Sequence, residues 1–400
     1  MTKELEREVA RKAKAMTRRE VIIKAIAKQI TWQQAADICG MTARHMQRLK
    51  IAYEKYDVGG LVDGRGGRPR RPRIPVATIE EVLRLRREEY VDFSVKHFHE
   101  HITEKHRLAI SYKWTLTVLQ DAGLAERAPG RGKHRRKRER RPMQGMMLHL
   151  DGSTHQWIAE QPARDLIWFL DDADGRVLFG RFVEEEGTLS TFEALHHVLA
   201  QRGRFCELYH DRGSHFGRTS KAGAGPDAEQ NGQVSRALKA LGIRQVFALS
   251  PEARGRSERS FRTVQGRLPQ ELRHAEITDY DAANRYLEEV FIPDFNRRFS
   301  VRPAQKESAF TPLVGIDLRL LLSAKHERVV RNDNTVTFRN TTLQIPESKD
   351  RMHYVRCPVL VHEFVDGSLG ISYQSKLLAR YNRDGDLIAD SKPRARRALP

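Results

Sequence analysis

The sequence contains no long apolar segment and few cysteines. None of its apolar runs approaches the roughly 20 residues needed to cross a bilayer, which disfavours a membrane-spanning protein. The first twenty residues are charged throughout and lack the apolar stretch of a secretory signal. Its 3 cysteines, Cys39, Cys206 and Cys357, lie far apart and form no CxxC pair. This pattern argues against a disulfide scaffold or a structural zinc site and favours a reducing cytoplasm.

Positive charge is what the sequence has in excess. The 71 Lys and Arg residues outnumber the 52 Asp and Glu residues, which gives a formal net charge of +19. Such a field attracts polyanions, and the DNA backbone with its condensed counterions is the favoured partner over an anionic membrane surface. A length of 400 residues suggests two or three domains, each able to bury its own core.

Residues 1–63 are predicted to form a helix-turn-helix DNA-binding domain. Ala36 allows two helices to approach, Gly40 suits the turn between them, and Thr42 can cap the second helix. The outward positions of that second helix carry side chains that contact phosphates and base edges. These candidate DNA-binding residues are Arg44, His45, Gln47, Arg48 and Lys50. A helical hairpin with a merely solvated charged face is the alternative.

Two basic linkers are predicted, at 64–77 and 129–142. The first is rich in Gly, Pro and Arg, which excludes a helix, and its core is similar to peptides that lie in the minor groove. A plain solvated linker is the alternative interpretation. The second linker is too densely charged to pack and is expected to follow the phosphate backbone. Their candidate DNA-binding residues are Arg65, Arg68, Arg70, Arg135 and Arg136.

Between the linkers, residues 78–128 are predicted to form a second helix-turn-helix domain. Ser111 can cap its last helix, and Lys113 is a candidate DNA contact. His97 and His101, one helical turn apart, could hold a metal ion. Because no HExxH motif and no nearby cysteine accompanies them, a surface helix is the favoured interpretation.

Residues 143–300 hold three candidate carboxylates that lie far apart in the sequence. Asp151 and Asp211 each follow an apolar run typical of a buried strand, and Glu258 lies in a basic helix expected over 254–273. The predicted order of three strands, helix, strand, helix, strand and helix implies a mixed sheet with helices on both faces. Since Mg²⁺ prefers oxygen ligands, these acids predict metal-dependent chemistry on nucleic acid.

Other acids compete with these three. Glu252 precedes Glu258 but lies in the proline-led turn, so Glu258 is preferred. Four aspartates could replace Asp151, and the expected hairpin explains two of them as turn residues. The four are Asp165, Asp171, Asp172 and Asp174, of which the last two lie in the turn.

The ordered acids and their flanks resemble the DDE signature of the retroviral-integrase-like superfamily. The carrying motifs are Asp151-Gly-Ser-Thr-His155-Gln-Trp157, Asp211-Arg-Gly-Ser-His-Phe216, Gly255-Arg-Ser-Glu258-Arg259 and, near the N-terminus, Gly40-Met-Thr-Ala-Arg44-His45. More narrowly, they look like bacterial insertion-sequence transposases of the ISNCY type. Asp211 and Glu258 are separated by 46 residues, more than is usual in the superfamily. The glycine-rich stretch Gly217–Gln233 is interpreted as an inserted loop.

The resemblance implies a reaction and its participants. Asp151, Asp211 and Glu258 would be the catalytic residues and the ligands of two Mg²⁺ (or Mn²⁺) ions. Water would cleave at the transposon end, and the freed 3′-hydroxyl would then attack target DNA. The implied partners are terminal inverted repeats and target DNA, with at least a homodimer in the DNA complex, in the bacterial cytoplasm at the nucleoid. The arginines expected to hold phosphates beside Glu258 are Arg254, Arg256, Arg259 and Arg262.

Two other functions stay open at this point. A domesticated transposase could act as a DNA-binding regulator without catalysis, and a ribonuclease-H-like nuclease could cleave without strand joining. A DNA-binding regulator would have no reason to retain candidate catalytic acids at all three positions, which disfavours that function. Cleavage and joining assays separate all three.

The C-terminal part is predicted to be a β module. Residues 301–325 form a connector, 326–385 alternate in a pattern typical of a small antiparallel β-barrel or sheet, and 386–400 form a basic tail. By resemblance this module would contact DNA or a partner subunit. The expected fold class is therefore multidomain, with N-terminal all-α helix-turn-helix units, a central α/β ribonuclease-H-like mixed sheet and a C-terminal small antiparallel β-barrel.

Overall fold

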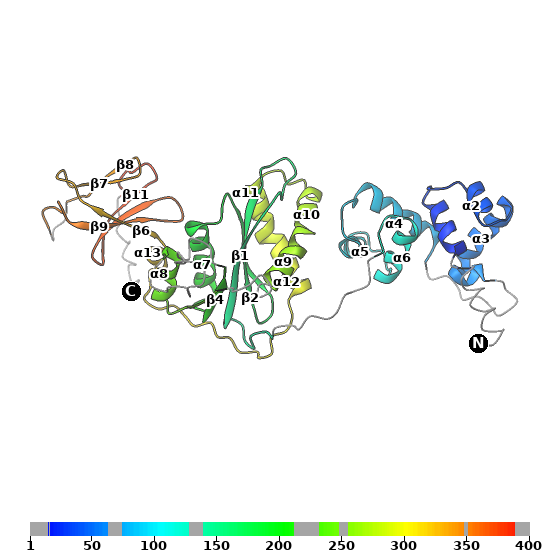
Figure 1. Ribbon diagram of the computed structural model, residues 1–400, viewed down its shortest axis with the longest axis horizontal. Helices are drawn as coiled ribbons and strands as arrows, with labels where there is room; N and C mark the ends of the chain where they lie inside the picture. The colour runs from blue at the N-terminus through cyan, green and yellow to red at the C-terminus, as the bar shows by residue number, and fades with distance from the viewer. Residues whose placement is uncertain are drawn as a thin grey trace, which may run out of the picture. The chain divides into compact units, whose positions relative to one another are not determined.

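The chain divides into two compact units, Met1–Arg136 and Lys137–Pro400 (Figure 1). The boundary lies within the predicted linker 129–142. The computed structural model describes residues 15, 17–62, 74–127, 139–211, 232–247, 255–347 and 351–388. No helix in these ranges is both long enough and apolar enough to cross a membrane.

The N-terminal unit is helical. After a helical segment over residues 17–26, its elements are α2 (Trp32–Ile38), α3 (Ala43–Tyr56), η1 (Asp57–Leu61), α4 (Val76–Glu88), α5 (Val95–Glu104) and α6 (Tyr112–Asp121). Thr42 Oγ1 accepts a hydrogen bond from His45 N at 3.3 Å, and Ser111 Oγ accepts one from Trp114 N at 3.3 Å. Both predicted caps are therefore present at the starts of α3 and α6.

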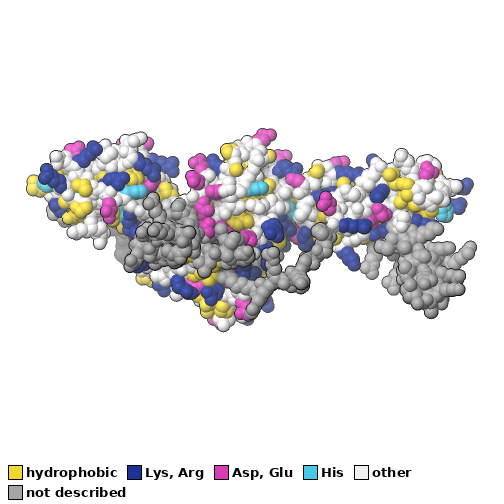
Figure 2. All heavy atoms as spheres, viewed as in Figure 1, with side chains coloured by type: hydrophobic (Ala, Val, Ile, Leu, Met, Phe, Trp, Pro, Cys, Tyr) yellow, Lys and Arg dark blue, Asp and Glu magenta, His cyan; other side chains and the backbone are white. Residues whose placement is uncertain are grey.

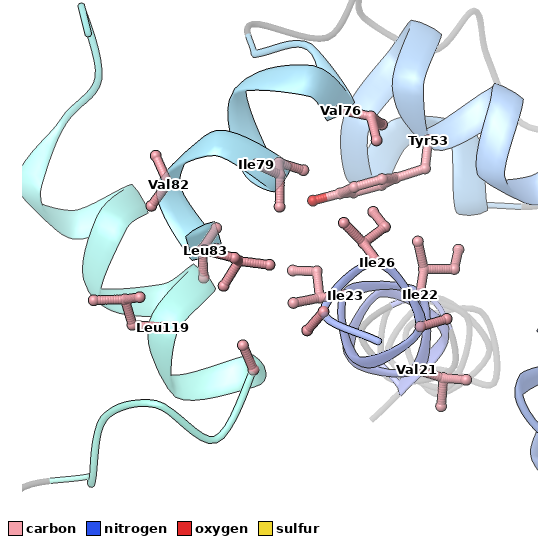
Figure 3. Close-up of a cluster of buried hydrophobic side chains, with 14 of the residues drawn as sticks. Val21, Ile22, Ile23, Ile26, Tyr53, Val76, Ile79, Val82, Leu83 and Leu119 are labelled. Carbon is pink, nitrogen blue, oxygen red and sulfur yellow. The ribbon is translucent and has the colours of Figure 1, made fainter. Parts of the chain in front are cut away.

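One hydrophobic core holds these helices together (Figure 3). Ile23 of the first helical segment, Ile79 of α4 and Leu119 of α6 all contribute to it. Arg19 and Asp121 add an ion pair at 3.3 Å between the two ends of the unit. The segments predicted as separate helix-turn-helix domains thus share a core, which sequence periodicity alone does not reveal.

The second unit contains a mixed five-stranded sheet in the order β3-β2-β1-β4-β5. Its strands are β1 (Met147–His155), β2 (Arg164–Asp171), β3 (Val177–Val183), β4 (Glu207–His210) and β5 (Arg244–Phe247). The pairs β1–β2 and β2–β3 are antiparallel, whereas β1–β4 and β4–β5 are parallel. This arrangement confirms the expected mixed sheet.

Helices cover both faces of this sheet (Figure 1). One face packs against α7 (Thr188–Arg202) and α8 (Gln233–Ala240) through residues such as Leu148 and Leu150. The other face packs against a second group of helices through residues such as Trp168 and Phe261. That group is α9 (Ser257–Gln265), α10 (Leu268–His274), α11 (Tyr280–Tyr286), η4 (Leu287–Phe291) and α12 (Ile292–Phe299).

The single helix expected over 254–273 is wrong, because α9 and α10 are separate. The break falls at Gly266 and Arg267. Pro269 follows at the start of α10, where its missing N–H costs nothing, whereas inside a continuous helix it would remove a hydrogen bond. The sequence carried both signals for this break.

Two asparagines occupy the outer edge of β3. Asn296 Oδ1 accepts from Val177 N at 2.7 Å, and Asn296 Nδ2 donates to Val177 O at 2.8 Å. Asn284 makes the same pair of bonds with Phe182, at 2.8 and 3.2 Å. Each amide thereby satisfies backbone groups that would otherwise be exposed on an edge strand.

The C-terminal part of this unit is an open antiparallel sheet in the order β11-β10-β9-β6, with a separate β7-β8 hairpin. Its elements are α13 (Leu318–Leu321), β6 (Ala324–Val329), β7 (Thr335–Phe338), β8 (Thr341–Gln344), β9 (Pro358–Glu363), β10 (Leu369–Tyr373) and β11 (Lys376–Tyr381). Among the described strands, β6 and β11 do not pair with each other, so the sheet keeps two edges. The predicted barrel is not confirmed.

Candidate active site

Asp151 lies within β1, and Asp211 directly follows β4, the strand that pairs with β1 in parallel. The register pairs His149 of β1 with Tyr209 of β4, and each aspartate follows two residues after its paired residue. Because side chains alternate along a strand, Asp151 lies on the same face of the sheet as His149. Asp151 is only 9% exposed. It lies in the middle of β1, so its expected position at a strand end is wrong.

That face of the sheet is the one covered by α9. Gln265 Nε2 on α9 donates to Ser153 Oγ at 2.9 Å, and Ser153 is two residues after Asp151 on β1. Trp168, which pairs with Asp151 across β1 and β2, donates from Nε1 to Ser260 Oγ of α9 at 2.8 Å. Helix α9 therefore runs alongside the Asp151 position.

Glu258 lies on the flank of α9 that faces β1. It precedes Gln265 by seven residues, which is two helical turns, so the two side chains share one flank. Gln265 reaches Ser153 on β1, whereas Ser260, on the other flank, reaches Trp168 on β2. Of the three predicted acids, Asp151 thus lies on the sheet face that α9 covers, Glu258 lies in α9 itself, and Asp211 follows the neighbouring strand β4. Glu258 is exposed and lies in the first turn of its helix.

The rival aspartates are engaged in structural hydrogen bonds. Asp165 accepts from Thr154 Oγ1 and from Glu186 N. Asp174 accepts from Gln144 Nε2 at 2.6 Å and from Arg176 N at 2.8 Å. Both carboxylates are thereby committed to the local fold.

Asp171 is also committed, and it is nearly inaccessible. Its two carboxylate oxygens accept from Gly145 N at 2.7 Å and from Ala173 N at 2.8 Å. Burial raises the pKa of Asp171 to about 6, although these two hydrogen bonds act in the opposite direction.

Asp172 is a buried anion at the turn between β2 and β3. Its Oδ1 accepts from His149 Nε2 at 2.8 Å and from the Arg256 guanidinium, and its Oδ2 accepts from Arg141 N at 2.7 Å. Burial opposes ionisation, but these hydrogen bonds hold the pKa of Asp172 well below its ordinary value. The sequence identified Asp172 as a turn residue and missed this network.

The predicted phosphate ligands near α9 differ in accessibility. The side chain of Arg256 is 17% exposed and paired with Asp172, whereas Arg259 and Arg262 are exposed. Arg254 and Glu252 lie outside the described residues, as does most of Gly217–Gln233. Among the described arginines of this segment, Arg259 and Arg262 are therefore the exposed ones near Glu258.

The predicted DNA contacts of α3 lie on its solvent side. Arg44, His45, Gln47 and Arg48 are exposed, and Lys50 is half-buried with its Nζ 5.1 Å from the ring centre of Trp32. Lys113 of α6 is exposed as well. The linker residues Arg65, Arg68, Arg70, Arg135 and Arg136 lie outside the described residues. Lys and Arg side chains are spread over the visible face, with acidic side chains among them (Figure 2).

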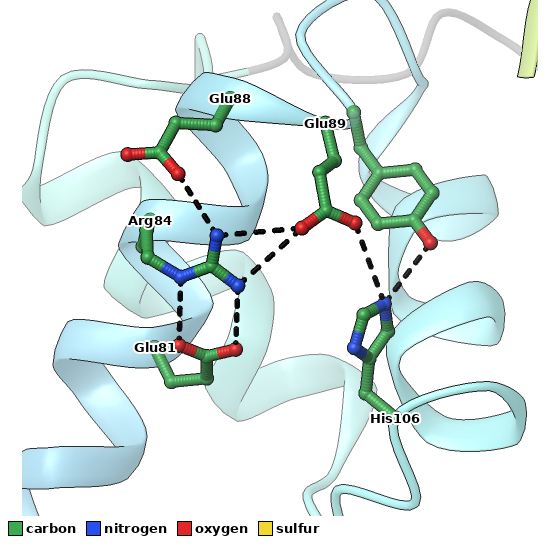
Figure 4. A network of polar contacts seen from close by, with 6 residues as sticks. Glu81, Arg84, Glu88, Glu89 and His106 are labelled. Atoms are coloured by element: carbon green, nitrogen blue, oxygen red, sulfur yellow. Dashed lines mark hydrogen bonds and ion pairs between the residues drawn. The ribbon is translucent and has the colours of Figure 1, made fainter.

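Helix α4 carries a face of different character (Figure 4). Arg84 is surrounded by three glutamates, with ion pairs of 2.9 Å to Glu81, 2.8 Å to Glu88 and 3.3 Å to Glu89. His106 Nε2 lies 3.9 Å from Glu89 Oε2. This exposed, acid-rich network makes α4 a poor candidate for phosphate contact compared with α3.

The favoured interpretation of α5 as a simple surface helix is wrong for two of its histidines. The His97 ring stacks on Phe93 at 4.1 Å between centroids, and the His101 ring meets Phe93 at 5.0 Å and Tyr90 at 5.5 Å. These rings belong to an aromatic cluster within the helical unit. The sequence signal for it was the four-residue spacing of the two histidines.

Comparison with known proteins relates most of the chain to transposases. It is 30% identical to "Putative transposase y4bF" of Sinorhizobium fredii (strain NBRC 101917 / NGR234) over 376 residues, which cover 92% of this chain and 81% of that protein. It is 24% identical to the transposase for insertion sequence IS1202 of Streptococcus pneumoniae over 399 residues, which cover 90% of this chain and 85% of that protein. No protein-family model matches the chain. The chain belongs to this family of transposases, and the recognition of a transposase from its motifs is confirmed.

Solved structures provide more distant likenesses. One is the simian T-cell lymphotropic virus intasome in complex with PP2A regulatory subunit B56 gamma, at 13% identity and a TM-score of 0.34, covering 76% of this chain and 98% of that one. Another is the HTLV-2 integrase catalytic core domain in complex with magnesium (dimeric form), at 16% identity and a TM-score of 0.28, covering 37% of this chain and 89% of that one. At these scores neither likeness adds to the family assignment.

Proposed function

We propose that this transposase cleaves DNA at transposon ends and joins the freed 3′-hydroxyl to target DNA, with Asp151, Asp211 and Glu258 as its catalytic residues. The observation that carries the proposal is the register of β1 and β4. Asp151 follows His149 in β1, and Asp211 follows the paired Tyr209 at the end of β4, which supports a shared site near the face along which α9 runs. Glu258 lies on the α9 flank directed toward β1.

The three side chains fit divalent metal ions. All are carboxylates, and Mg²⁺ prefers such oxygen ligands. Two carboxylates brought close together, one of them buried, would repel each other, and a cation relieves such repulsion. A pair of Mg²⁺ or Mn²⁺ ions bound there would stabilise both the attacking and the leaving oxygen of an in-line displacement.

The chain's own residues would then place the DNA. Arg259 and Arg262 stand exposed near Glu258 and would hold phosphates next to the scissile bond. We assign Arg256 to Asp172 rather than to DNA, because their ion pair occupies it. The DDE chemistry itself needs no covalent protein–DNA intermediate, so no serine or tyrosine nucleophile is assigned.

Recognition of terminal inverted repeats is assigned to the helical unit. Helices α2 and α3 meet at Gly40, whose φ of 63° suits a tight turn, in the manner of a helix-turn-helix motif. The exposed side chains of α3 would enter the major groove, and Lys113 on α6 would contact a second segment. The arginines of the two linkers would contact the backbone between them. Because two ends must be joined, we expect at least a homodimer on DNA.

The test is cleavage of DNA fragments that contain the sequences flanking the coding region, with Mg²⁺ or Mn²⁺. Asp151→Asn, Asp211→Asn and Glu258→Gln should each lower cleavage by about a hundredfold or more, since each removes charge stabilisation from the transition state. Glu184→Gln is the matched control, because the Glu184 side chain is 86% exposed and pairs with Arg164, which lies opposite His155 at the end of β1.

Each alternative function predicts a different result. If Asp151→Asn cuts like the wild type, the proposed site is wrong. A protein that binds the flanking repeats but never cuts is a regulator. Cleavage without joined products in a target plasmid identifies a nuclease.

A further inference from the structure

Two residues before each of the three proposed catalytic acids lies a side chain that belongs to one cluster. His149 precedes Asp151 by two residues, Tyr209 precedes Asp211 by two, and Arg256 precedes Glu258 by two. The three come from β1, β4 and the N-cap position of α9. The elements that carry the acids are therefore linked directly beside the acids.

Asp172 is the centre of that cluster. Its Oδ1 accepts from His149 Nε2 at 2.8 Å and forms the ion pair with Arg256 Nη1. The His149 ring lies 4.8 Å from the Tyr209 ring, centroid to centroid. Asp172 N also donates to Met147 O at 3.0 Å, which fixes the turn to the first residue of β1. One carboxylate, 1% exposed, thus connects β1, the β2–β3 turn and α9.

We propose that Asp172 is a positioning residue that fixes the N-terminus of α9 against β1 and so sets Glu258 relative to Asp151. This inference rests on the proposed function, in which Glu258 and Asp151 share metal ions. Metal ligands must be held to within roughly half an ångström of their working geometry. The apolar contacts of Phe261 and Val264 also hold α9 to the sheet, but such contacts are not directional. The hydrogen bonds of Ser260 and Gln265 are directional, but they lie further along the helix than its N-terminus.

The charge of the Asp172–Arg256 ion pair favours a role in positioning α9 over a role in stabilising the fold. A buried ion pair is costly to desolvate, and apolar side chains of the same volume usually stabilise a fold as well or better. What the pair adds is direction, because the guanidinium must point at one carboxylate oxygen. Asp172 would therefore hold the start of α9 in one place while Arg259 and Arg262 meet DNA.

The first test measures α9 directly in the full-length protein by hydrogen exchange. In Arg256→Ala the Ser257–Gln265 amides should exchange about tenfold faster or more, since the local restraint is lost. Asp172 keeps its bonds from His149 and Arg141 in this variant, so the core should remain folded. The matched control is Arg298→Ala, which removes a similarly buried arginine (13% exposed) from its 2.6 Å pair with Asp294 on α12. Exchange in α9 should be unchanged there.

The second test measures the metal requirement. The Mn²⁺ concentration that gives half-maximal cleavage should rise about tenfold in Asp172→Asn and Arg256→Ala, because a displaced Glu258 binds metal less well. Arg256→Lys, which restores the charge, should recover part of the loss. Arg298→Ala should need the same Mn²⁺ concentration as the wild type.

The outcomes separate this inference from the proposed function. Wild-type α9 exchange and an unshifted Mn²⁺ requirement in Arg256→Ala would overturn the positioning role. So would a uniform loss of protection across the whole core, which would assign the pair to folding. The exchange measurement does not depend on catalysis. If Asp151→Asn cuts like the wild type, the proposed function fails, while exchange still decides whether Asp172 restrains α9.

Discussion

The two sheets of the second unit bury polar side chains in different ways. In the core sheet, Asp172 is ionised between His149 and Arg256. In the C-terminal sheet, His362 lies between two hydroxyls, with Ser323 Oγ 2.8 Å from Nδ1 and Ser372 Oγ 2.7 Å from Nε2. Burial, together with Lys325 and Arg236, lowers the pKa of His362 to about 4, so this histidine is neutral at pH 7.

On the proposal above, the Asp172 cluster positions a catalytic acid, whereas the His362 cluster serves the fold. A buried charge is expensive, and a fold that needs only cohesion can use neutral hydrogen bonds or apolar contacts instead. His362 uses the neutral solution. The C-terminal sheet also buries the Glu363 carboxylate, which pairs at 2.8 Å with the largely exposed Arg339. Asp172 keeps its charge where β1, the β2–β3 turn and α9 meet, beside the proposed catalytic acids.

The largest expected effect comes from breaking the charged cluster outright. Asp172→Ala should destabilise the second unit by about 3–5 kcal/mol, because it leaves the buried partners of the carboxylate unpaired. Urea denaturation, followed by tryptophan fluorescence, measures this loss of unfolding free energy, since Trp157 and Trp168 lie in the core. Asp294→Ala, at a side chain that is 39% exposed, is the control and should cost much less. Equal losses would remove the contrast between buried and half-exposed pairs.

Acid should weaken the C-terminal sheet through His362. Its pKa is about 4 in the fold against 6.5 in a model peptide, so folding favours the neutral form. The contribution of His362 to the free energy of unfolding is fully present above pH 6.5. It falls by about 3 kcal/mol in total as the pH decreases toward 4. Hydrogen exchange of β9 and β10 between pH 7 and 4.5, corrected for intrinsic rates, measures it. His362→Gln should abolish the pH dependence; if that variant keeps it, another group is responsible.

Over the same pH range the turn after β2 should respond in the opposite direction. The pKa of Asp171 is about 6 in the fold against 3.8 in a model peptide, so folding favours its protonated form. Stability near Gly145 and Ala173 should therefore increase by about 2–3 kcal/mol as pH falls from 7 toward 4. Asp172, whose pKa is lowered, loses its contribution only below about pH 3.8. Hydrogen exchange of the Ala173 amide measures this effect. We expect it to slow on acidification in the wild type but not in Asp171→Asn. The same pH dependence in both proteins would contradict the prediction.

Much of the core sheet could be predicted from the sequence because its signals are local. Apolar runs marked the strands, and the helix expected after the third strand is α7. Thr42 and Ser111 cap the helices that they were expected to cap. The parallel pairing of β1, which carries Asp151, with β4, which Asp211 follows, also agrees with the order of the elements expected from the sequence.

The contacts that the sequence did not reveal join distant residues. Asp172 and Arg256 are 84 positions apart, and Val177 and Asn296 are 119 apart. No periodicity links such pairs, and a turn aspartate has a sufficient local explanation. The sequence left a barrel and a sheet open for the C-terminal strands for a related reason, because alternation predicts strands but not whether the first and last of them meet.

The smallest expected effect concerns the sheet edges, where the two sheets also differ. In the core sheet the edge strand β3 is covered by Asn284 and Asn296, whose amides take the place of a neighbouring strand. Asn296→Ala should cost about 1–3 kcal/mol, because it leaves the N–H and C=O of Val177 without their partner. Asn284→Ala together with Asn296→Ala should also produce concentration-dependent association, since an uncovered edge can pair with another chain. Sedimentation at several concentrations measures this. An unchanged sedimentation coefficient in the double variant would show that the flanking helices, rather than the two amides, keep the edge from pairing.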